Sequence, residues 1–211
     1  MTTELLLTTP IGKAAARPIA PRIDLRTGLV AAGALVAPPS LSALVREVRA
    51  ARQAWRGAGF SAPLSVHLPD ALIFEAEVDW LSDAARECGC APKGLTFELS
   101  EAACLAGGAD VAEGLRARGW GVALIADPAC PLPFGKHARA LYTELIVDAP
   151  EPIDPYLAID SCERDTLGRR LYAAKEAGLI ITAPYVRTDE AASLLAIAGF
   201  DRCGGPVAAQ P

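Results

Sequence analysis

Leu95-Thr96-Phe97-Glu98-Leu99-Ser100-Glu101 and Gly121-Val122-Ala123-Leu124-Ile125-Ala126-Asp127 are the two most informative segments of this sequence. Each is typical of a short apolar strand with an acid at its carboxyl end, and a helical pattern over 111–118 lies between them. Two strands joined by a helix predict a parallel pair. Acids at the carboxyl ends of neighbouring parallel strands are how a barrel builds a metal site.

The same alternation extends in both directions along the chain. We expect further strands over 29–36, 64–68, 144–147, 179–183 and from 200, and helices over 41–55, 70–86, 134–142, 165–176 and 189–198. Short apolar strands alternating with helices predict parallel strands covered by helices. The expected fold class is therefore α/β, with a shortened (β/α) barrel of the TIM type. An open doubly wound sheet is the alternative, although no Gly-x-Gly-x-x-Gly follows the first strand.

The length of 211 residues suits one sizeable core and is too short for two comfortable domains. Residues 1–22 lack clear periodicity and are expected to form an N-terminal arm, ahead of a barrel domain over 23–211. Hydrophobic residues make up 52% of the chain, yet no apolar run reaches the ~18 residues of a membrane span. The first residues lack the basic segment of a secretory signal, so we expect a cytoplasmic protein with no membrane contact.

The net charge and the spacing of the cysteines limit which classes of partner and cofactor are expected. The net charge of −5 argues against nucleic acid as a partner. Of the six cysteines only Cys88 and Cys90 are close in sequence, and no second pair or histidine spacing completes a zinc pattern. We expect reduced thiols and no cofactor.

Seven segments in order resemble motifs of the EAL family of cyclic di-GMP phosphodiesterases. They are Ile23–Gly28 for VDLRTG, Leu64–Leu68 for LSVNLS, Phe97–Glu101 for LEITE, Gly121–Asp127 for the strand entering DDFG, Glu144–Asp148 for ELKID, Gly178–Glu190 for GLKVVAEGVETEE, and Gly199–Asp201 for GCD. The resemblance covers about residues 20–206 and implies an EAL barrel. A loop and a helix of the family are missing between Pro39 and Ser42, so the barrel is expected to have thinner helical cover on one side.

The family hydrolyses a phosphodiester with two metal ions, which activate a water and neutralise the phosphate. By resemblance, Glu98 and Asp127 stand at metal-ligand positions, and Glu101 stands where the family has an acid that holds a loop. His67 replaces the asparagine ligand. Together His67, Glu98 and Asp127 are the candidates for a vestigial metal site, expected at one end of the sheet within about 10 Å of each other.

The other functional positions of the family carry different residues here. The signature glutamate falls on Gly33, the arginine after it on Ala37, the second aspartate on Pro128, the glycine turn on Ala129-Cys130, the lysine on Ile146, the late glutamate on Pro184 and the glutamine on Gly204. Losing one positioned electrostatic group commonly costs about 100- to 1,000-fold in rate. The chain is therefore expected to have no catalytic residues and no enzymatic activity.

A barrel that keeps its fold without the catalytic groups is expected to act through a protein partner, by analogy with degenerate members of the family. Candidates for the partner surface at the carboxyl rim are Glu101, Pro128, Phe134, Pro184, Tyr185 and Arg187. Cyclic di-GMP is not expected to bind. The sequence leaves open whether the chain forms a homodimer. The alternatives are a cyclic di-GMP receptor without hydrolysis and a metal-dependent hydrolase that uses His67, Glu98 and Asp127.

Overall fold

Eight strands form a closed ring in the computed structural model, which describes residues 19–35, 41–75, 77–127, 138–147 and 161–205. The strands follow one another round the barrel in chain order: β1 Ile19–Asp24, β2 Val30–Leu35, β3 Leu64–His67, β4 Leu95–Ser100, β5 Gly121–Ile125, β6 Glu144–Ile146, β7 Ile180–Ala183 and β8 Arg202–Cys203. Strands β2 to β8 run parallel, whereas β1 is antiparallel to both of its neighbours, β2 and β8. The expected α/β barrel is confirmed, and the open sheet is excluded.

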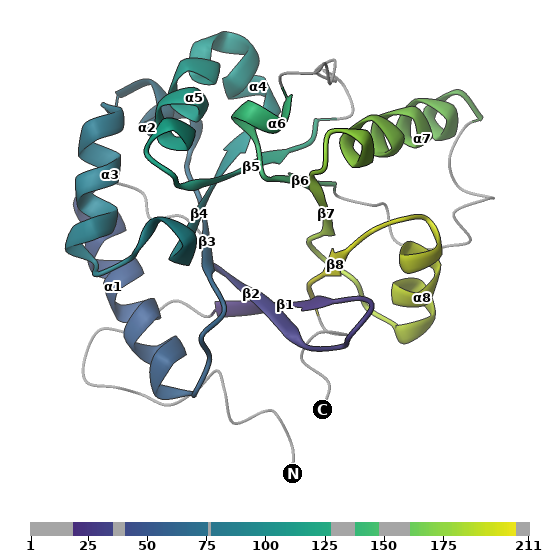
Figure 1. Cartoon of the computed structure of the whole chain (residues 1–211), viewed down its shortest axis with the longest axis horizontal. Helices are drawn as coiled ribbons and strands as arrows, with labels where there is room; N and C mark the ends of the chain where they lie inside the picture. Colours follow the sequence, from purple (N-terminus) through teal and green to yellow (C-terminus); the bar gives the residue numbers. More distant parts are fainter. Residues whose placement is uncertain (1–18, 36–40, 76, 128–137, 148–160, 206–211) are drawn as a thin grey trace.

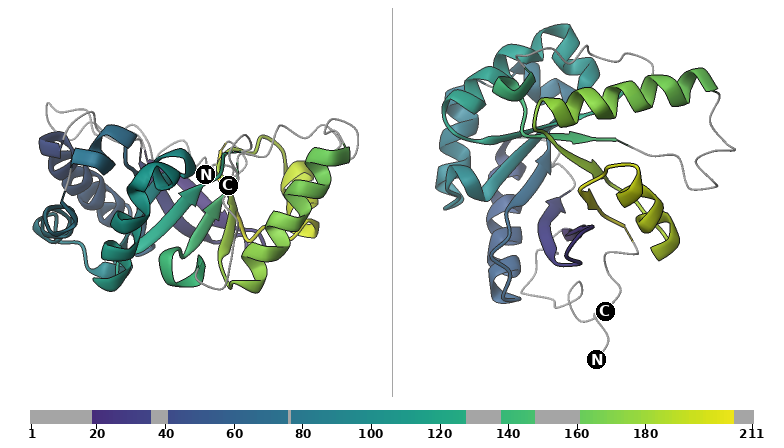
Figure 2. Two further views of the ribbon diagram at one scale, coloured as in Figure 1. Left: turned by 90° about the horizontal axis from the view of Figure 1, so that it is seen from above. Right: turned by 45° about the vertical axis from the view of Figure 1, so that its right-hand side comes forward.

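Helices lie outside the ring of strands, as Figure 1 and the two further views in Figure 2 show. They are α1 Leu41–Gly57, α2 Asp70–Glu75, α3 Val78–Glu87, α4 Glu101–Ala103, α5 Ala109–Ala117, α6 Ala138–Leu141, α7 Ser161–Glu176 and α8 Asp189–Ile197, with a 3₁₀ turn η2 at Pro92–Gly94 and a π-helical turn η3 at Cys104–Gly108. No helix in the described part of the chain is long and apolar enough to span a membrane.

Period-two alternation sorts the strand residues between the helical layer and the barrel interior. Phe97 and Val122 are register partners on β4 and β5 and are buried on the helix side, where the Phe97 ring meets Trp120 edge-on with centroids 5.9 Å apart. The core residues predicted from the sequence are all buried, namely Val66, Phe97, Leu124, Val147 and Ile181.

The N-terminal boundary of the barrel differs from the expectation. Strand β1 begins at Ile19, so residues 19–22 belong to the barrel and not to an arm. Apolar Ile19 packs outward against the helical layer, while Arg22 points into the ring and is 4% exposed. The alternation of β1 could not be recognised in the sequence, because the strand mixes apolar and charged residues and contains or follows prolines. Residues 1–18, the rest of the expected arm, lie outside the described residues.

Several helices also differ in their limits. The helix expected over 70–86 is two helices, α2 and α3, and the helical region after β4 begins at Glu101 instead of 111. Ser100 starts that region because its Oγ accepts a hydrogen bond from the backbone N–H of Ala103 at 3.0 Å. Of the segment expected to be helical over 134–142, α6 occupies Ala138–Leu141, and 134–137 lie outside the described residues.

Helix α1 covers the side of the barrel next to the shortened segment. A Cβ atom on Gly33 would lie 2.7 Å from Ile19 Cγ2 and 3.1 Å from the Trp55 ring, so the glycine lets α1 approach β2 closely. Trp55 is held there by its Nε1, which donates to the Ala62 carbonyl at 2.8 Å, and by stacking on Phe60. Residues 36–40, where the family segment is missing, lie outside the described residues.

Candidate functional site

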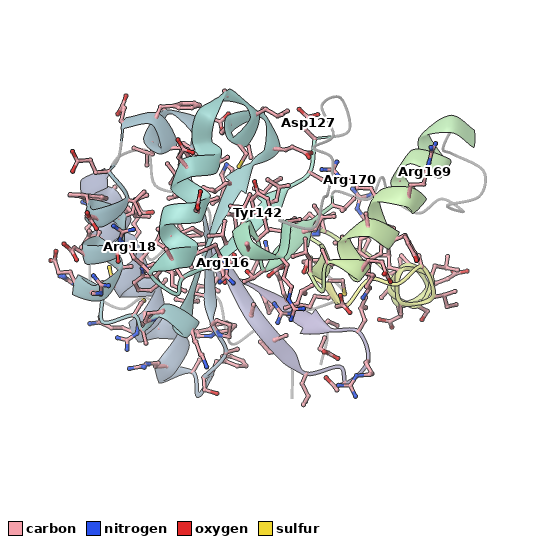
Figure 3. All side chains as sticks on the ribbon, turned by 45° about the horizontal axis from the view of Figure 1, so that its top comes forward. Arg116, Arg118, Asp127, Tyr142, Arg169 and Arg170 are labelled. Atoms are coloured by element: carbon pink, nitrogen blue, oxygen red, sulfur yellow. The ribbon has the colours of Figure 1, made fainter. Side chains whose placement is uncertain are left out.

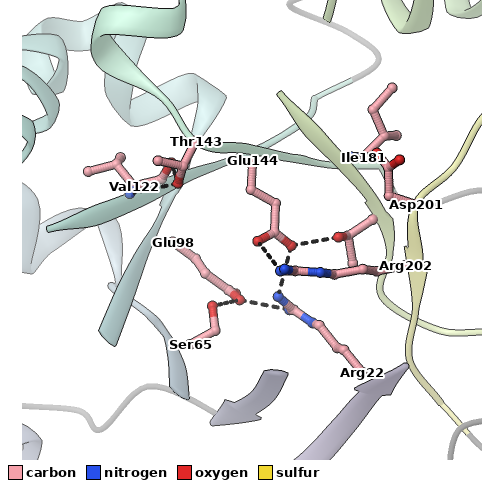
Figure 4. Close-up of polar contacts among 10 residues, drawn as sticks. Arg22, Ser65, Glu98, Val122, Thr143, Glu144, Ile181, Asp201 and Arg202 are labelled. Carbon is pink, nitrogen blue, oxygen red and sulfur yellow. Dashed lines mark hydrogen bonds and ion pairs between the residues drawn. The ribbon is translucent and has the colours of Figure 1, made fainter. Parts of the chain in front are cut away.

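A layer of four charged side chains fills the barrel interior: Arg22, Glu98, Glu144 and Arg202. One Glu98 carboxylate oxygen lies 2.7 Å from Arg22 Nη2, and one Glu144 oxygen lies 3.5 Å from Arg22 Nη1. The other Glu144 oxygen pairs with Arg202 Nη1 at 3.3 Å. Figure 4 shows the two carboxylates converging on the two guanidinium groups. We call this set the charge layer.

Two hydroxyl groups complete the charge layer. Ser65 Oγ donates to the same Glu98 oxygen that faces Arg22, and Thr182 Oγ1 donates to Glu144 at 2.6 Å. Ser65 and Thr182 are buried, so both hydroxyls act away from solvent. The carboxylates thereby gain hydrogen bonds as well as opposite charges, which a buried ion needs to offset its lost hydration.

Strand register explains why these residues meet. Glu98 pairs with Ala123, and Ala123 pairs in turn with Glu144, so a small methyl group separates the two glutamates across β5. Thr182 is the register partner of Arg202 on the far side of the ring. Arg22 arrives from the antiparallel strand β1, where it stands three residues after the outward-facing Ile19 and therefore points into the ring.

The carboxyl rim carries a second buried acid. Glu101 is fully buried at the start of α4, accepts a hydrogen bond from the backbone N–H of Asp127 at 2.6 Å, and forms an ion pair with Arg170 of α7. Figure 3 shows Asp127 and Arg170 at this end of the barrel. Glu101 therefore ties the end of β5 to α7, a geometry that agrees with the loop-holding role expected from the resemblance.

The three candidates for a vestigial metal site come from three consecutive strands. His67 and Glu98 are register partners on β3 and β4, and Asp127 comes after β5, four residues beyond Ala123, the β5 partner of Glu98. No group of three or more His, Cys, Asp or Glu side chains among the described residues is arranged to hold a metal ion. The closeness of all three side chains stays a prediction.

The residues present do not fit the divalent metals that the resemblance implies. Hard cations take several oxygen ligands, but the Glu98 carboxylate already serves Arg22 and Ser65. The inward positions of β2 next to this layer are Ala32 and Ala34, because Gly33 faces Trp55 on the outside. Gly33, the expected position of the signature acid, thus faces the helical layer, and β2 supplies no carboxylate to the interior.

Two further positions above the charge layer carry no ligand for a hard cation. Ile146 follows Glu144 by two residues on β6, and Pro184 follows Thr182 by two residues after β7. Neither side chain carries an oxygen. Nδ1 of His67 is buried without a hydrogen-bond partner, and one imidazole beside an occupied carboxylate does not make a ligand set.

Of the expected partner surface, Glu101 is fully buried and offers no area to a partner, so that candidate is wrong, and the other described candidates lie after β7. Tyr185 is 47% exposed, and the guanidinium carbon of Arg187 lies 5.7 Å from the centroid of its ring. The preceding residue, Pro184, has its carbonyl 2.6 Å from the site where a Cβ on Gly204 would stand, so the glycine allows this loop to close onto the end of β8. Pro128 and Phe134, the other candidates, lie outside the described residues.

The described cysteines are buried thiols. Burial raises the pKa of Cys88 and of Cys203 to about 11, and it raises the pKa of Cys90 and Cys104 as well. Thiols with raised pKa values form little thiolate at neutral pH and are poor nucleophiles and ligands. Cys130 lies outside the described residues.

Sequence reasoning missed most of the charge layer. Arg22 was assigned to the arm, and Ser65, Glu144, Thr182 and Arg202 were not singled out. The available signal was a polar residue at an alternate position within each apolar strand, such as Ser65 in Leu64–His67. One such residue per strand is weak by itself, and only the closed ring shows that all of them face one another.

Comparison with known proteins gives structural matches only. No family model matches the sequence, and no curated protein matches it significantly. The fold is similar to that of PaMucR phosphodiesterase in a c-di-GMP complex, with a TM-score of 0.72 and 17% identity over 92% of this chain and 90% of that one. The EAL domain of Mycobacterium smegmatis DcpA gives 0.70 and 21% identity over 92% and 91% of the two chains.

A third match is Klebsiella pneumoniae BlrP1 in a manganese and cyclic di-GMP complex. Its TM-score is 0.72 at 16% identity, and the alignment covers 95% of this chain but 57% of BlrP1. At such identities the likeness establishes the fold and leaves the activity to be argued from the site.

Proposed function

We propose that this chain, which has the fold of an EAL domain, is a catalytically inactive relative that regulates through contact with a protein partner. The carrying observation is the Arg22–Glu98 ion pair, 2.7 Å long and almost closed to solvent. In a two-metal hydrolysis the carboxylates must be free to hold cations. Here the carboxylate at the first metal-ligand position of the resemblance is neutralised by a side chain of the same barrel.

The composition of the interior supports the same proposal. Gly33, Ile146 and Pro184 stand where the resemblance has a glutamate, a lysine and a second glutamate. An enzyme of this class depends on metal ligands and on the lysine that orients the attacking water. With these groups absent together, no arrangement of the described residues activates a water or grips a phosphate.

The proposed partner surface is the segment after β7 that carries Pro184, Tyr185 and Arg187. Pro128 and Phe134 remain candidates from the sequence alone. Exposed Tyr185 with Arg187 beside its ring combines an aromatic face and a fixed positive charge. Tyrosine and arginine are enriched at the centres of protein interfaces, because they bury a large area and keep polar contacts. Glu101 stiffens the opposite side of the carboxyl rim through Asp127 and Arg170.

Two measurements test this proposal. Incubation of the full chain with cyclic di-GMP and Mg²⁺ or Mn²⁺ is expected to yield no linear product, and turnover would overturn the inactive assignment. Partner capture from the native host is expected to recover a specific protein with the wild type and to lose it with Tyr185→Ala. Tyr172→Ala, which alters a still more exposed tyrosine on α7, is the control and should retain the partner.

Cyclic di-GMP is the ligand of several structural neighbours, among them PaMucR and BlrP1. A receptor that binds this nucleotide without hydrolysis is therefore the second candidate function. Calorimetric titration separates the two: the first proposal expects no saturable heat, while a dissociation constant below ~10 μM, worth about −7 kcal/mol, would favour the receptor.

A further inference from the structure

The charge layer is electrically balanced without any bound ion. Glu98 and Glu144 contribute two negative charges, and Arg22 and Arg202 contribute two positive charges. A divalent cation added to this set would leave two uncompensated positive charges in a dry interior, where unpaired charge is costly. The layer is therefore balanced in charge as it stands, while Arg22 Nη1 has an ion-pair contact with Glu144 but no hydrogen-bond partner among the described residues.

Arg22 holds the central position in that balance. Its guanidinium contacts both glutamates, with Nη2 2.7 Å from Glu98 and Nη1 3.5 Å from Glu144, and its side chain is 5% exposed. Arg202 contacts Glu144 alone in this layer and is more exposed, at 19% of its side chain. A single planar cation thus bridges two carboxylates, which is what a metal ion does between acidic ligands.

The inward orientation of this arginine follows from the strand itself. Ile19 faces the helical layer, where its Cγ2 lies beside Gly33, and Arg22 stands three residues later, on the opposite face of β1. The register shift next to Arg22 places its extra residue, Ala31, on the neighbouring strand β2 and leaves β1 regular. On the other side, Arg22 Cγ is at ordinary contact distance, 3.5 Å, from the site where a Cβ on Gly204 would stand.

We infer that the Arg22 guanidinium is the resident cation of this barrel and takes the place of a divalent metal between Glu98 and Glu144. The two glutamates do not fit a metal because an arginine of the same barrel already neutralises them. The inference goes beyond the proposed partner function and does not depend on which surface a partner uses.

The first test is the metal response of the full chain. Thermal unfolding of the wild type is expected to shift by less than about 1 °C between EDTA and 1 mM Mn²⁺ or Mg²⁺, because a site with a 10 μM dissociation constant would raise the midpoint by roughly 5 °C or more. Glu98→Gln, which keeps Arg22, is expected to be equally insensitive. A Mn²⁺-dependent rise in the wild type that Glu98→Gln removes would overturn the inference.

The second test is a double-mutant cycle in urea. Arg22→Met and Glu98→Gln are expected to be coupled. The double variant should be more stable than the two single effects together predict, with an unfolding equilibrium constant at least about tenfold smaller than the additive value. The matched pair Arg202→Met with Glu98→Gln should be additive, since these two side chains share no ion pair. Additivity of Arg22→Met with Glu98→Gln would also overturn the inference. If Arg22→Met does not fold, the metal test still decides, because it uses only chains that retain Arg22. Partner capture and hydrolysis test the proposed function separately.

Discussion

Arg22 Nη2 lies 2.7 Å from Glu98 Oε1 although the two residues belong to β1 and β4, which are not neighbours in the barrel. The contact therefore crosses the lumen instead of running between adjacent strands. It joins the single antiparallel strand to the strand that carries the strongest acidic motif of the sequence. The ion pair therefore links strands that share no backbone hydrogen bonds.

Glu101→Ala is expected to lower the free energy of unfolding by about 3–5 kcal/mol, because it leaves the buried Arg170 charge and the Asp127 amide without their shared acceptor. Urea denaturation monitored by circular dichroism measures the change. Glu87→Ala is the control, since Glu87 pairs with Arg49 on the surface, and it should cost less than about 1 kcal/mol. Equal losses for the two variants would show that Glu101 does not clamp the rim.

Gly33→Ala is expected to destabilise the protein by roughly 1–3 kcal/mol, because the new methyl group would stand 2.7 Å from Ile19 Cγ2 and 3.1 Å from the Trp55 ring. Gly57→Ala adds the same methyl group where no atom lies within 4 Å, so its effect should be within about 0.5 kcal/mol of zero or stabilising. Thermal unfolding of the pair checks the assignment of Gly33 to the outer face of β2. A larger loss at Gly57 than at Gly33 would contradict it.

Variants of Asp201 and Lys175 separate the contribution of a side-chain hydrogen bond to a strand amide from that of a surface ion pair. Asp201 accepts the Ile181 backbone N–H at 2.8 Å and pairs with Lys175 at 2.6 Å, on side chains 38% and 40% exposed. The ion pair should be worth less than about 1 kcal/mol, and Asp201→Asn and Lys175→Met should therefore both be mild. Asp201→Ala, which removes the acceptor from a strand amide, should cost about 1–2 kcal/mol. Urea midpoints of the three variants test this ranking.

Stability should fall as the pH rises from about 9 to 11. Burial raises the pKa of Cys88 and Cys203 from 9.0 to about 11 in the folded chain, so above pH 9 the unfolded chain releases protons that the folded chain retains. The thiol contribution is thus fully present below pH 9 and is lost through the folded pKa. A Cys88→Ala, Cys203→Ala double variant should show a flatter decline in urea stability between pH 8 and 11. If the double variant loses stability with pH as steeply as the wild type, groups other than these two thiols cause the alkaline loss.

The α/β alternation, the burial of Val66 and Phe97, and the barrel itself could be predicted from the sequence, since apolar periodicity reports which face of an element is covered. Strand β1 could not, because Pro21 and Arg22 interrupt its pattern. Its place depends on pairing with β2 and β8, which are separated from each other by most of the chain. Such long-range pairing overrides local preference.

The candidate site shows the same division. The motifs drew attention to Glu98 and Glu101, which the structure places in buried networks. They did not indicate that Glu98 faces an arginine, because the partner enters from a distant strand and carries no motif. The outward direction of Gly33 also needed coordinates, since Gly33 and Ala34 differ only in the face to which they point.

Closure of the ring between β1 and β8 has a consequence for biosynthesis. Ile23 and Asp24 pair with Cys203 and Arg202, so β1 must wait during synthesis for β8, which is made about 180 residues later. The β1–β2 hairpin can form early because its contacts are local, but the seam itself joins segments of very high sequence separation, which slows folding. Until translation reaches β8, Arg22 and Glu98 face an open and wetted lumen, and the unpaired β1 edge is a target for chaperones or for misassembly.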